Sequence, residues 1–193
     1  MEHRTDEELL AGSLKGHSGD FKTLLERYEE ELFNFLYHTT GDRQAAEDLF
    51  QETFLQVFSN LERFRPEGRF RPWVYTIAAN LARDEMRRRR RRKSASLDEE
   101  ISPGEDAKLV DMIGSQTAEP EAVANSREAA TLAGELLSRL PETLREVVTL
   151  YFYNDMKYAE ISAALGLPMG TVKSRLFRAI REMSQAMKQK RGF

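Results

Sequence analysis

The chain of 193 residues contains no cysteine, which excludes disulfides, thiol nucleophiles, thiolate zinc sites and iron–sulfur clusters. Its only histidines, His3, His17 and His38, fit no metal-ligand spacing and do not suggest a histidine-based catalytic site. The sequence therefore predicts no metal, no cofactor and no catalytic residue, and we expect the protein not to be an enzyme.

Long hydrophobic runs are also absent, since no stretch approaches the roughly 18 apolar residues of a membrane-spanning helix. Residues 1–12 are acidic and contain no apolar segment of the kind found in secretory signals. We therefore expect a cytoplasmic protein with no membrane insertion. With 40% hydrophobic residues the chain is too apolar to be disordered, and its length suits one large domain or two small ones.

The net charge of −3 hides two strongly basic blocks. Residues 63–93 contain twelve basic and three acidic residues, with six consecutive arginines at 87–92. Residues 171–193 contain seven basic residues and one acidic residue, whereas residues 94–131 between the blocks contain two and nine. Such blocks indicate a polyanionic partner, and the arginine run favours nucleic acid over ordinary solvated charge.

Apolar residues recur at three- and four-residue steps along most of the chain and predict helices. The helix predicted over residues 43–62 has one broad apolar face made of Leu49, Phe50, Phe54, Val57, Phe58 and Leu61. Gly41 and Asp42 separate it from the helix before, and no stretch alternates with the period of a strand. The sequence predicts an all-α fold of two small helical domains, residues 1–93 and 125–193, joined by a flexible acidic linker over 94–124.

Residues 158–176 have the pattern of a helix-turn-helix. Ile161 and Leu165 anchor a first helix, and Gly166 stands where that helix must end in a left-handed turn. Leu167 is expected to fill the gap between the helices. Val172, Leu176 and Ile180 are expected to form the buried stripe of the second helix. Its other face, with Thr171, Lys173, Ser174, Arg175 and Arg178, is predicted to be exposed and to enter a major groove. The alternative is a helical hairpin of an ordinary bundle.

Two motif sets resemble bacterial sigma factors of the extracytoplasmic function (ECF) class, in the sigma-70 family. Residues 46–54 and 70–84 resemble that family's region two, and residues 140–141, 158–161 and 170–176 resemble its region four. The resemblance covers roughly residues 18–92 and 125–188. It implies a subunit that binds core RNA polymerase and selects promoter DNA, and that an anti-sigma factor can hold inactive. The arginine run departs from the family pattern, and the resemblance assigns it no role.

The resemblance also implies three groups of site residues. Core polymerase would be bound by one face of the second predicted helix, made of Asp48, Gln51, Glu52 and Leu55. The −10 element would be recognised and melted by Phe64, Arg69, Trp73, Tyr75, Asn80 and Arg83. The −35 element would be bound by Tyr158, Thr171, Lys173, Ser174, Arg175, Phe177 and Arg178. Aromatic rings can hold unstacked bases, and arginines can hold phosphates. Tyr75 and Asn80 are expected to point away from the buried stripe of their helix.

Two other readings remain open at this point. A stand-alone helix-turn-helix regulator, with an N-terminal sensor or dimerisation domain, would explain residues 140–193. It would leave the aromatic and basic helix near Trp73 unexplained. A nuclease or phosphotransferase would need a phosphate loop or a metal cluster, and the sequence suggests neither.

Overall fold

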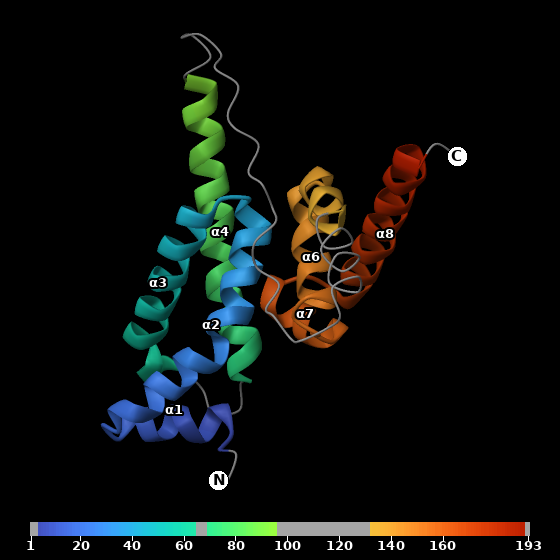
Figure 1. Cartoon of the computed structure of the whole chain (residues 1–193). Coiled ribbons are helices and arrows are strands. Elements are labelled where there is room, and N and C mark those ends of the chain that lie inside the picture. Colours follow the sequence, from blue (N-terminus) through green and yellow to red (C-terminus); the bar gives the residue numbers. More distant parts are fainter. Residues whose placement is uncertain (1–3, 65–68, 96–131, 192–193) are drawn as a thin grey trace, which may run out of the picture.

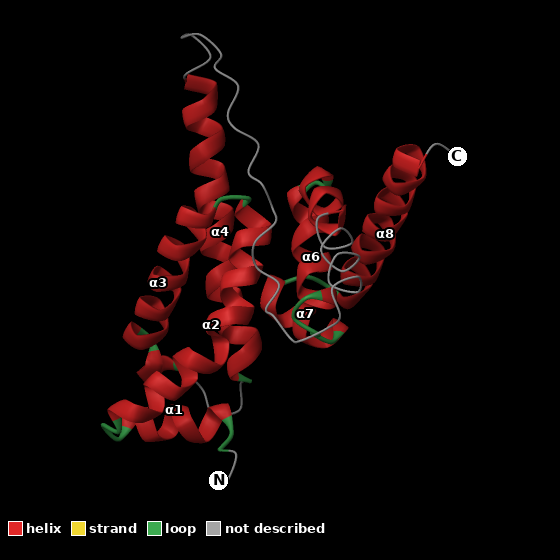
Figure 2. Ribbon diagram, in the orientation of Figure 1, coloured by secondary structure: helices red, strands yellow, loops and turns green. Residues whose placement is uncertain are grey.

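The structure, a computed structural model, describes residues 4–64, 69–95 and 132–191. Over these ranges the regular elements are all helical, with no strand, which confirms the predicted fold class (Figure 2). The elements are α1 (Asp6–Leu14), α2 (Ser18–Thr40), α3 (Arg43–Ser59), a short 3-10 turn (Leu61–Arg63), α4 (Phe70–Ala95), a helix over 132–139, α6 (Glu142–Phe152), α7 (Tyr158–Leu165) and α8 (Met169–Arg191). Most of the predicted linker, and the predicted start of the second domain at residue 125, lie outside the described residues.

The N-terminal half is a bundle in which α2, α3 and α4 lie side by side and α1 crosses one end (Figure 1). As predicted, α2 ends at Gly41, whose φ of 68° is in the left-handed region that glycine adopts without strain. Asp42 then caps α3, because its Oδ1 accepts a hydrogen bond from the Ala45 amide at 3.0 Å. This sharp turn makes α3 run back along α2.

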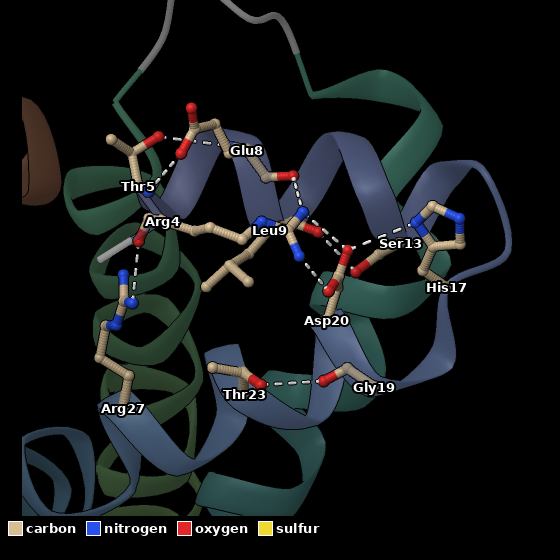
Figure 3. A network of polar contacts seen from close by, with 10 residues as sticks. All are labelled: Arg4, Thr5, Glu8, Leu9, Ser13, His17, Gly19, Asp20, Thr23 and Arg27. Carbon is tan, nitrogen blue, oxygen red and sulfur yellow. Dashed lines mark hydrogen bonds and ion pairs between the residues drawn. The ribbon is translucent and has the colours of Figure 1, made fainter. Parts of the chain in front are cut away.

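The sequence reading did not identify α1, although a capping box marks its start. The Glu8 amide donates to Thr5 Oγ1 at 3.2 Å, and the Thr5 amide donates to Glu8 Oε2 at 2.7 Å (Figure 3). Arg4 ties this segment to α2 through Asp20, with Nη2 lying 2.9 Å from Oδ2. The Thr–x–x–Glu pattern over residues 5–8 was the signal that could have predicted the helix.

The C-terminal half packs α6 and α7 against α8, and its helix-turn-helix has the predicted local geometry. Gly166 ends α7 in the left-handed conformation, and the Ser162 hydroxyl donates to the Leu167 carbonyl oxygen at 2.5 Å. Val172 and Leu176 are buried, as expected. The prediction for Ile180 was wrong, because Ile180 is 43% exposed and Ala179 takes the buried position.

The two halves lie in direct contact, which the sequence did not predict. Helix α4 packs against α7, and α2 packs against α6. The buried apolar residues of both halves form one continuous cluster. The contact therefore involves α2 and α4 of the first half and α6 and α7 of the second.

Candidate nucleic-acid and protein interfaces

Helix α3 presents an exposed face with the four residues predicted to bind polymerase. Asp48, Gln51, Glu52 and Leu55 are all exposed, and Leu55 keeps 63% of its surface accessible. Phe58 was predicted to be on the buried face, but it is 63% exposed. Its ring packs edge-on against Phe21, with ring centroids 5.4 Å apart. The face thus combines an apolar end with two exposed carboxylates, each of which accepts a hydrogen bond from a glutamine one turn away on α3. This combination suits a basic amphipathic helix.

A groove of about 710 Å³ runs between α3 and α4 beside this face. Asp48 and Glu52 line one wall, and Arg88, Arg89 and Arg92 line the other. Most of the arginine run has carboxylate partners, which the charge count alone did not reveal. The ion pairs are Arg87–Asp84, Arg88–Glu85, Arg89–Glu85, Arg89–Asp42, Arg90–Glu142 and Arg92–Glu85. Much of the run's charge is therefore neutralised within the chain.

The residues predicted to bind the −10 element occupy different environments. Phe64 and Trp73 are half-buried, with ring centroids 4.9 Å apart, at the start of α4 beside exposed Arg69. Asn80 is exposed, as predicted. The loop between Phe64 and Arg69, predicted to form a base pocket, falls on residues 65–68 outside the described part of the chain.

Tyr75 does not point into solvent, and this prediction was wrong. Its side chain is fully buried, with its ring edge-on to Phe35 of α2 at 5.5 Å between centroids. Its hydroxyl accepts a hydrogen bond from Asn154 Nδ2 at 2.9 Å. Burial raises the pKa of Tyr75 well above its usual range. Phe35 of the N-terminal half and Asn154 of the second half thus both contact a residue that spacing alone placed on an open face.

Arg83 is likewise engaged by the C-terminal half. Its Nε and Nη2 donate to the two carboxylate oxygens of Glu146 on α6, each at 2.8 Å. Glu146 is 1% exposed, and its burial raises the pKa of this carboxyl, an effect that the Arg83 charge opposes. The positive charge of Arg83 offsets the free-energy cost of burying this carboxylate.

Further polar contacts join the halves around this pair. Arg71 Nη2 donates to Glu31 Oε2 at 2.8 Å and also to the Asn154 carbonyl oxygen. Arg145 Nη1 donates to the Thr39 carbonyl oxygen at 3.2 Å, and Arg69 lies 3.7 Å from Glu160. These contacts line both sides of the α4–α6–α7 junction. A hollow of about 420 Å³ remains there between Trp73 of α4 and Ala163 of α7.

The predicted DNA-reading helix, α8, remains open to solvent. The exposed residues are Lys173, Ser174, Phe177 and Arg178, with Phe177 at 72%. Thr171 and Arg175 were also predicted to be exposed, but the structure shows them half-buried. Tyr158 of α7 stacks on Tyr151 at 5.4 Å between ring centroids, and its ring lies under Lys173 Nζ at 5.7 Å. This cation–π contact holds a lysine at the start of α8, where a groove-binding helix meets DNA.

The described residues contain no cluster of His, Asp and Glu side chains that could hold a metal ion. None of the helices in the same ranges is both long enough and apolar enough to cross a membrane.

Comparison with known families matches both halves of the chain. Residues 24–92 match the Sigma-70 region 2 family, and residues 131–183 match Sigma-70, region 4. The chain is 31% identical over 182 residues to the ECF RNA polymerase sigma-E factor of Escherichia coli (strain K12), covering 92% of each chain. It is 29% identical over 164 residues to the ECF RNA polymerase sigma factor SigW of Bacillus subtilis (strain 168), covering 85% of this chain and 87% of SigW.

Solved structures have a similar fold. The sigma factor RpoE of Bartonella quintana, in complex with the anti-sigma factor NepR, superposes with a TM-score of 0.69 at 24% identity. That match covers 88% of this chain and 97% of the other. CnrH in complex with the cytosolic domain of CnrY gives a TM-score of 0.68 at 22% identity, covering 96% and 99%.

Proposed function

Because the chain belongs to the extracytoplasmic function class of sigma-70 factors, we propose that its two halves read different promoter elements. The protein binds core RNA polymerase and directs promoter-specific initiation of transcription. Residues 24–92 match region two of this family, so the N-terminal half is not a sensor domain attached to a stand-alone regulator. The proposal concerns which residues perform each task.

Core polymerase binds the α3 face made of Asp48, Gln51, Glu52 and Leu55 in this proposal. The support is their common exposure on one rigid helix, next to exposed Phe58. The acidic face attracts a basic partner helix electrostatically, and its apolar end provides surface that the partner can bury.

The domain of residues 1–93 recognises and melts the −10 element. The aromatic ring of Trp73 in the first turn of α4, and that of Phe64 packed against it, are suited to stacking on unpaired bases. Arg69 and Arg83 would hold phosphates, and exposed Asn80 can read a base edge. Tyr75 joins this surface only when its ring leaves the contacts with Phe35 and Asn154 that now bury it.

The domain of residues 125–193 binds the −35 element, and the exposed start of α8 is the observation that carries this assignment. Lys173, Ser174, Phe177 and Arg178 share the open side of a helix whose other side packs Val172 and Leu176. In this proposal the edge of the DNA-binding surface is formed by Tyr158, Thr171 and Arg175. This division into one packed and one open face is what major-groove docking requires.

Two broader assignments complete the proposal. The factor works in the cytoplasm, where polymerase and promoter DNA are found, and it positions polymerase without a catalytic site of its own. An anti-sigma factor is a further partner, supported by the solved relatives that are bound to such proteins.

Tethered cleavage in the holoenzyme tests the division of labour. Because the chain lacks cysteine, a single Asp84→Cys or Arg181→Cys substitution accepts one iron chelate that cleaves nearby DNA. The Asp84 tether is expected to cut near −10 and the Arg181 tether near −35 of a promoter found by run-off transcription. A tether at Glu26→Cys on α2 serves as the control, and a reversed cleavage pattern would overturn the assignment.

A further inference from the structure

Helix α1 lies before the segment that matches Sigma-70 region 2, which begins at residue 24. It crosses the end of the bundle where α4 begins (Figure 1). There it contacts both the 3-10 turn, which ends at Arg63 immediately before Phe64, and the start of α4 at Phe70. Helix α1 therefore touches the chain on both sides of the surface proposed to bind the −10 strand.

The first turn of α1 has three consecutive carboxylates, and two of them fix the helix in place. Glu8 closes the capping box at the start of α1. Asp6 accepts hydrogen bonds from Arg27 Nη1 and from the Tyr28 hydroxyl, both on α2. Burial raises the pKa of Tyr28, so its hydroxyl keeps the proton that it donates. Arg27 Nη2 also donates to the Arg4 carbonyl oxygen at 3.0 Å, which ties the segment before α1 to α2 (Figure 3).

The third carboxylate, Glu7, reaches α4. Its Oε1 accepts a hydrogen bond from the backbone amide of Phe70, the first residue of α4, at 3.4 Å. The first amides of a helix have no acceptor within the helix, and negative charge is favourable beside them. Glu7 is exposed, so removal of its carboxylate opens no cavity in the core. The contact can therefore be deleted without disturbing the packing of the bundle.

Phe70 connects this contact to the proposed base-stacking rings. Its side chain is fully buried, with its ring edge-on to Tyr28 at 5.3 Å between centroids. The Phe70 ring also lies edge-on to Trp73 at 6.0 Å and to Phe64 at 6.3 Å. Glu7 thus holds the backbone of the residue whose ring packs against both Trp73 and Phe64. Recognition of a ligand requires such groups to be held within about 0.5 Å of the productive position.

We propose that α1 is a positioning element for −10 recognition, in which Glu7 fixes the start of α4 and, through Phe70, the Trp73 and Phe64 rings. Glu7 acts through these residues and does not itself contact DNA. Its loss changes how well the holoenzyme distinguishes bases in the −10 strand, because misplaced rings fit the correct base less well. The proposal rests on the proposed role of Phe64 and Trp73 in binding that strand.

Base preference in the −10 strand tests this role in the holoenzyme. The probes are single-stranded oligonucleotides with the −10 element of a promoter found by run-off transcription, using whichever strand binds more tightly. One probe has the promoter's own sequence, and in each of the others one base is replaced. The ratio of two affinities does not depend on the active fraction, since inactive protein lowers binding to all strands alike. Glu7→Ala is expected to reduce the largest preference of the parent about 3- to 10-fold. Glu7→Gln keeps an acceptor oxygen and should retain most of the preference.

The matched control is Glu8→Ala, which removes the neighbouring carboxylate and opens the capping box of α1. This variant should unfold at a lower temperature but keep the base preference of the parent. An unchanged preference in Glu7→Ala, or an equal loss in Glu7→Ala and Glu8→Ala, would overturn the positioning role.

Trp73→Ala tests the proposed function separately, and it should weaken binding of every strand. If Trp73→Ala weakens binding while Glu7→Ala keeps the parent's base preference, the proposed −10 surface stands and only the role of α1 is overturned. A parent holoenzyme without base preference, or normal binding by Trp73→Ala, would contradict the −10 assignment and the role of α1 with it.

Discussion

Asn154, in the loop after α6, donates a hydrogen bond from Nδ2 to the hydroxyl oxygen of Tyr75 on α4. The two atoms are 2.9 Å apart, and both side chains are buried. The two residues are 79 positions apart in the sequence and belong to different halves of the protein. The contact ties an aromatic side chain with a proposed role in DNA melting to the domain with a proposed role in docking on duplex DNA. This relationship leads to the first prediction.

Tyr75→Ala is expected to impair promoter opening, whereas Tyr75→Phe is expected to preserve it. Phenylalanine keeps the ring that stacks on a base, at about 1–3 kcal/mol, and loses only the hydroxyl that Asn154 holds. Asn80→Ala should resemble Tyr75→Ala. The measurement is permanganate reactivity of unpaired thymines in holoenzyme complexes.

Pre-melted promoter DNA separates melting from docking in the same assay. A bubble removes the cost of opening and should partly rescue Tyr75→Ala. A bubble should not rescue Arg178→Ala. That variant loses about 1–3 kcal/mol of binding free energy to duplex DNA, which a bubble at the −10 element does not restore. Equal rescue of both variants would contradict the division between the two domains.

The double substitution Asp48→Arg with Glu52→Arg is expected to abolish binding to core polymerase and to leave the fold intact. Both side chains are exposed on α3, so reversing their charge repels a basic partner without disturbing the core. Glu26→Arg with Glu30→Arg makes the same change of charge on exposed positions of α2 and should bind normally. Co-purification with core polymerase is the readout. Wild-type assembly of the α3 variant would contradict the assigned face.

Lys173→Ala is expected to weaken binding of the holoenzyme to promoter DNA and to reduce its dependence on salt. One lost phosphate contact lowers the log–log salt slope by about one. Lys188→Ala serves as the control, because it removes the same charge at an exposed position further along α8. It should change the salt slope less than Lys173→Ala does. Filter binding over a range of salt concentrations gives both slopes, and equal slopes for the two variants would argue against groove docking by the start of α8.

Acidification is expected to weaken the contact between the halves through His38. Burial lowers the pKa of His38 to about 4, and the Arg145 charge on α6 adds to the effect. The Tyr153 ring packs against it at 4.5 Å between centroids. Because a lowered histidine pKa disfavours the protonated form in the folded state, its contribution is present above about pH 6.5 and is lost as pH falls toward 4. The distance between spin labels attached at Glu29→Cys on α2 and Ser184→Cys on α8, both exposed positions in a chain without cysteine, should lengthen over that window. His38→Gln should flatten this response.

Gly12→Ala is expected to destabilise the N-terminal half by about 1 kcal/mol. An added Cβ would lie 1.7 Å from Asp20 Oδ2, so the carboxylate must move away from Arg4 (Figure 3). The hydrogen bond from Arg4 lowers the pKa of Asp20, and displacement should return that pKa toward its usual value. Gly19→Ala on α2 meets no atom within 4 Å and should be neutral or slightly stabilising, since alanine favours helix. Thermal unfolding measures the stability of both variants. Equal stability would contradict the prediction that the added Cβ at Gly12 displaces the Asp20 carboxylate.

Local patterns in the sequence were enough to determine the helical class, the turn at Gly41–Asp42, the left-handed end of α7 at Gly166 and the open face of α3. Each depends on residues within a few positions of one another, where backbone sterics and helical spacing decide the outcome. The capping box at Thr5 was equally local and was overlooked.

Tertiary structure alone decided what covers each face. A period of 3.6 residues places Tyr75 on one side of its helix, but it does not say whether a distant segment packs there. Phe35 and Asn154 bury Tyr75, and Glu146 neutralises Arg83 from 63 residues away. Burial and ion pairing depend on segments that meet only when the chain has folded, because charge and apolar surface find partners through space and not along the sequence.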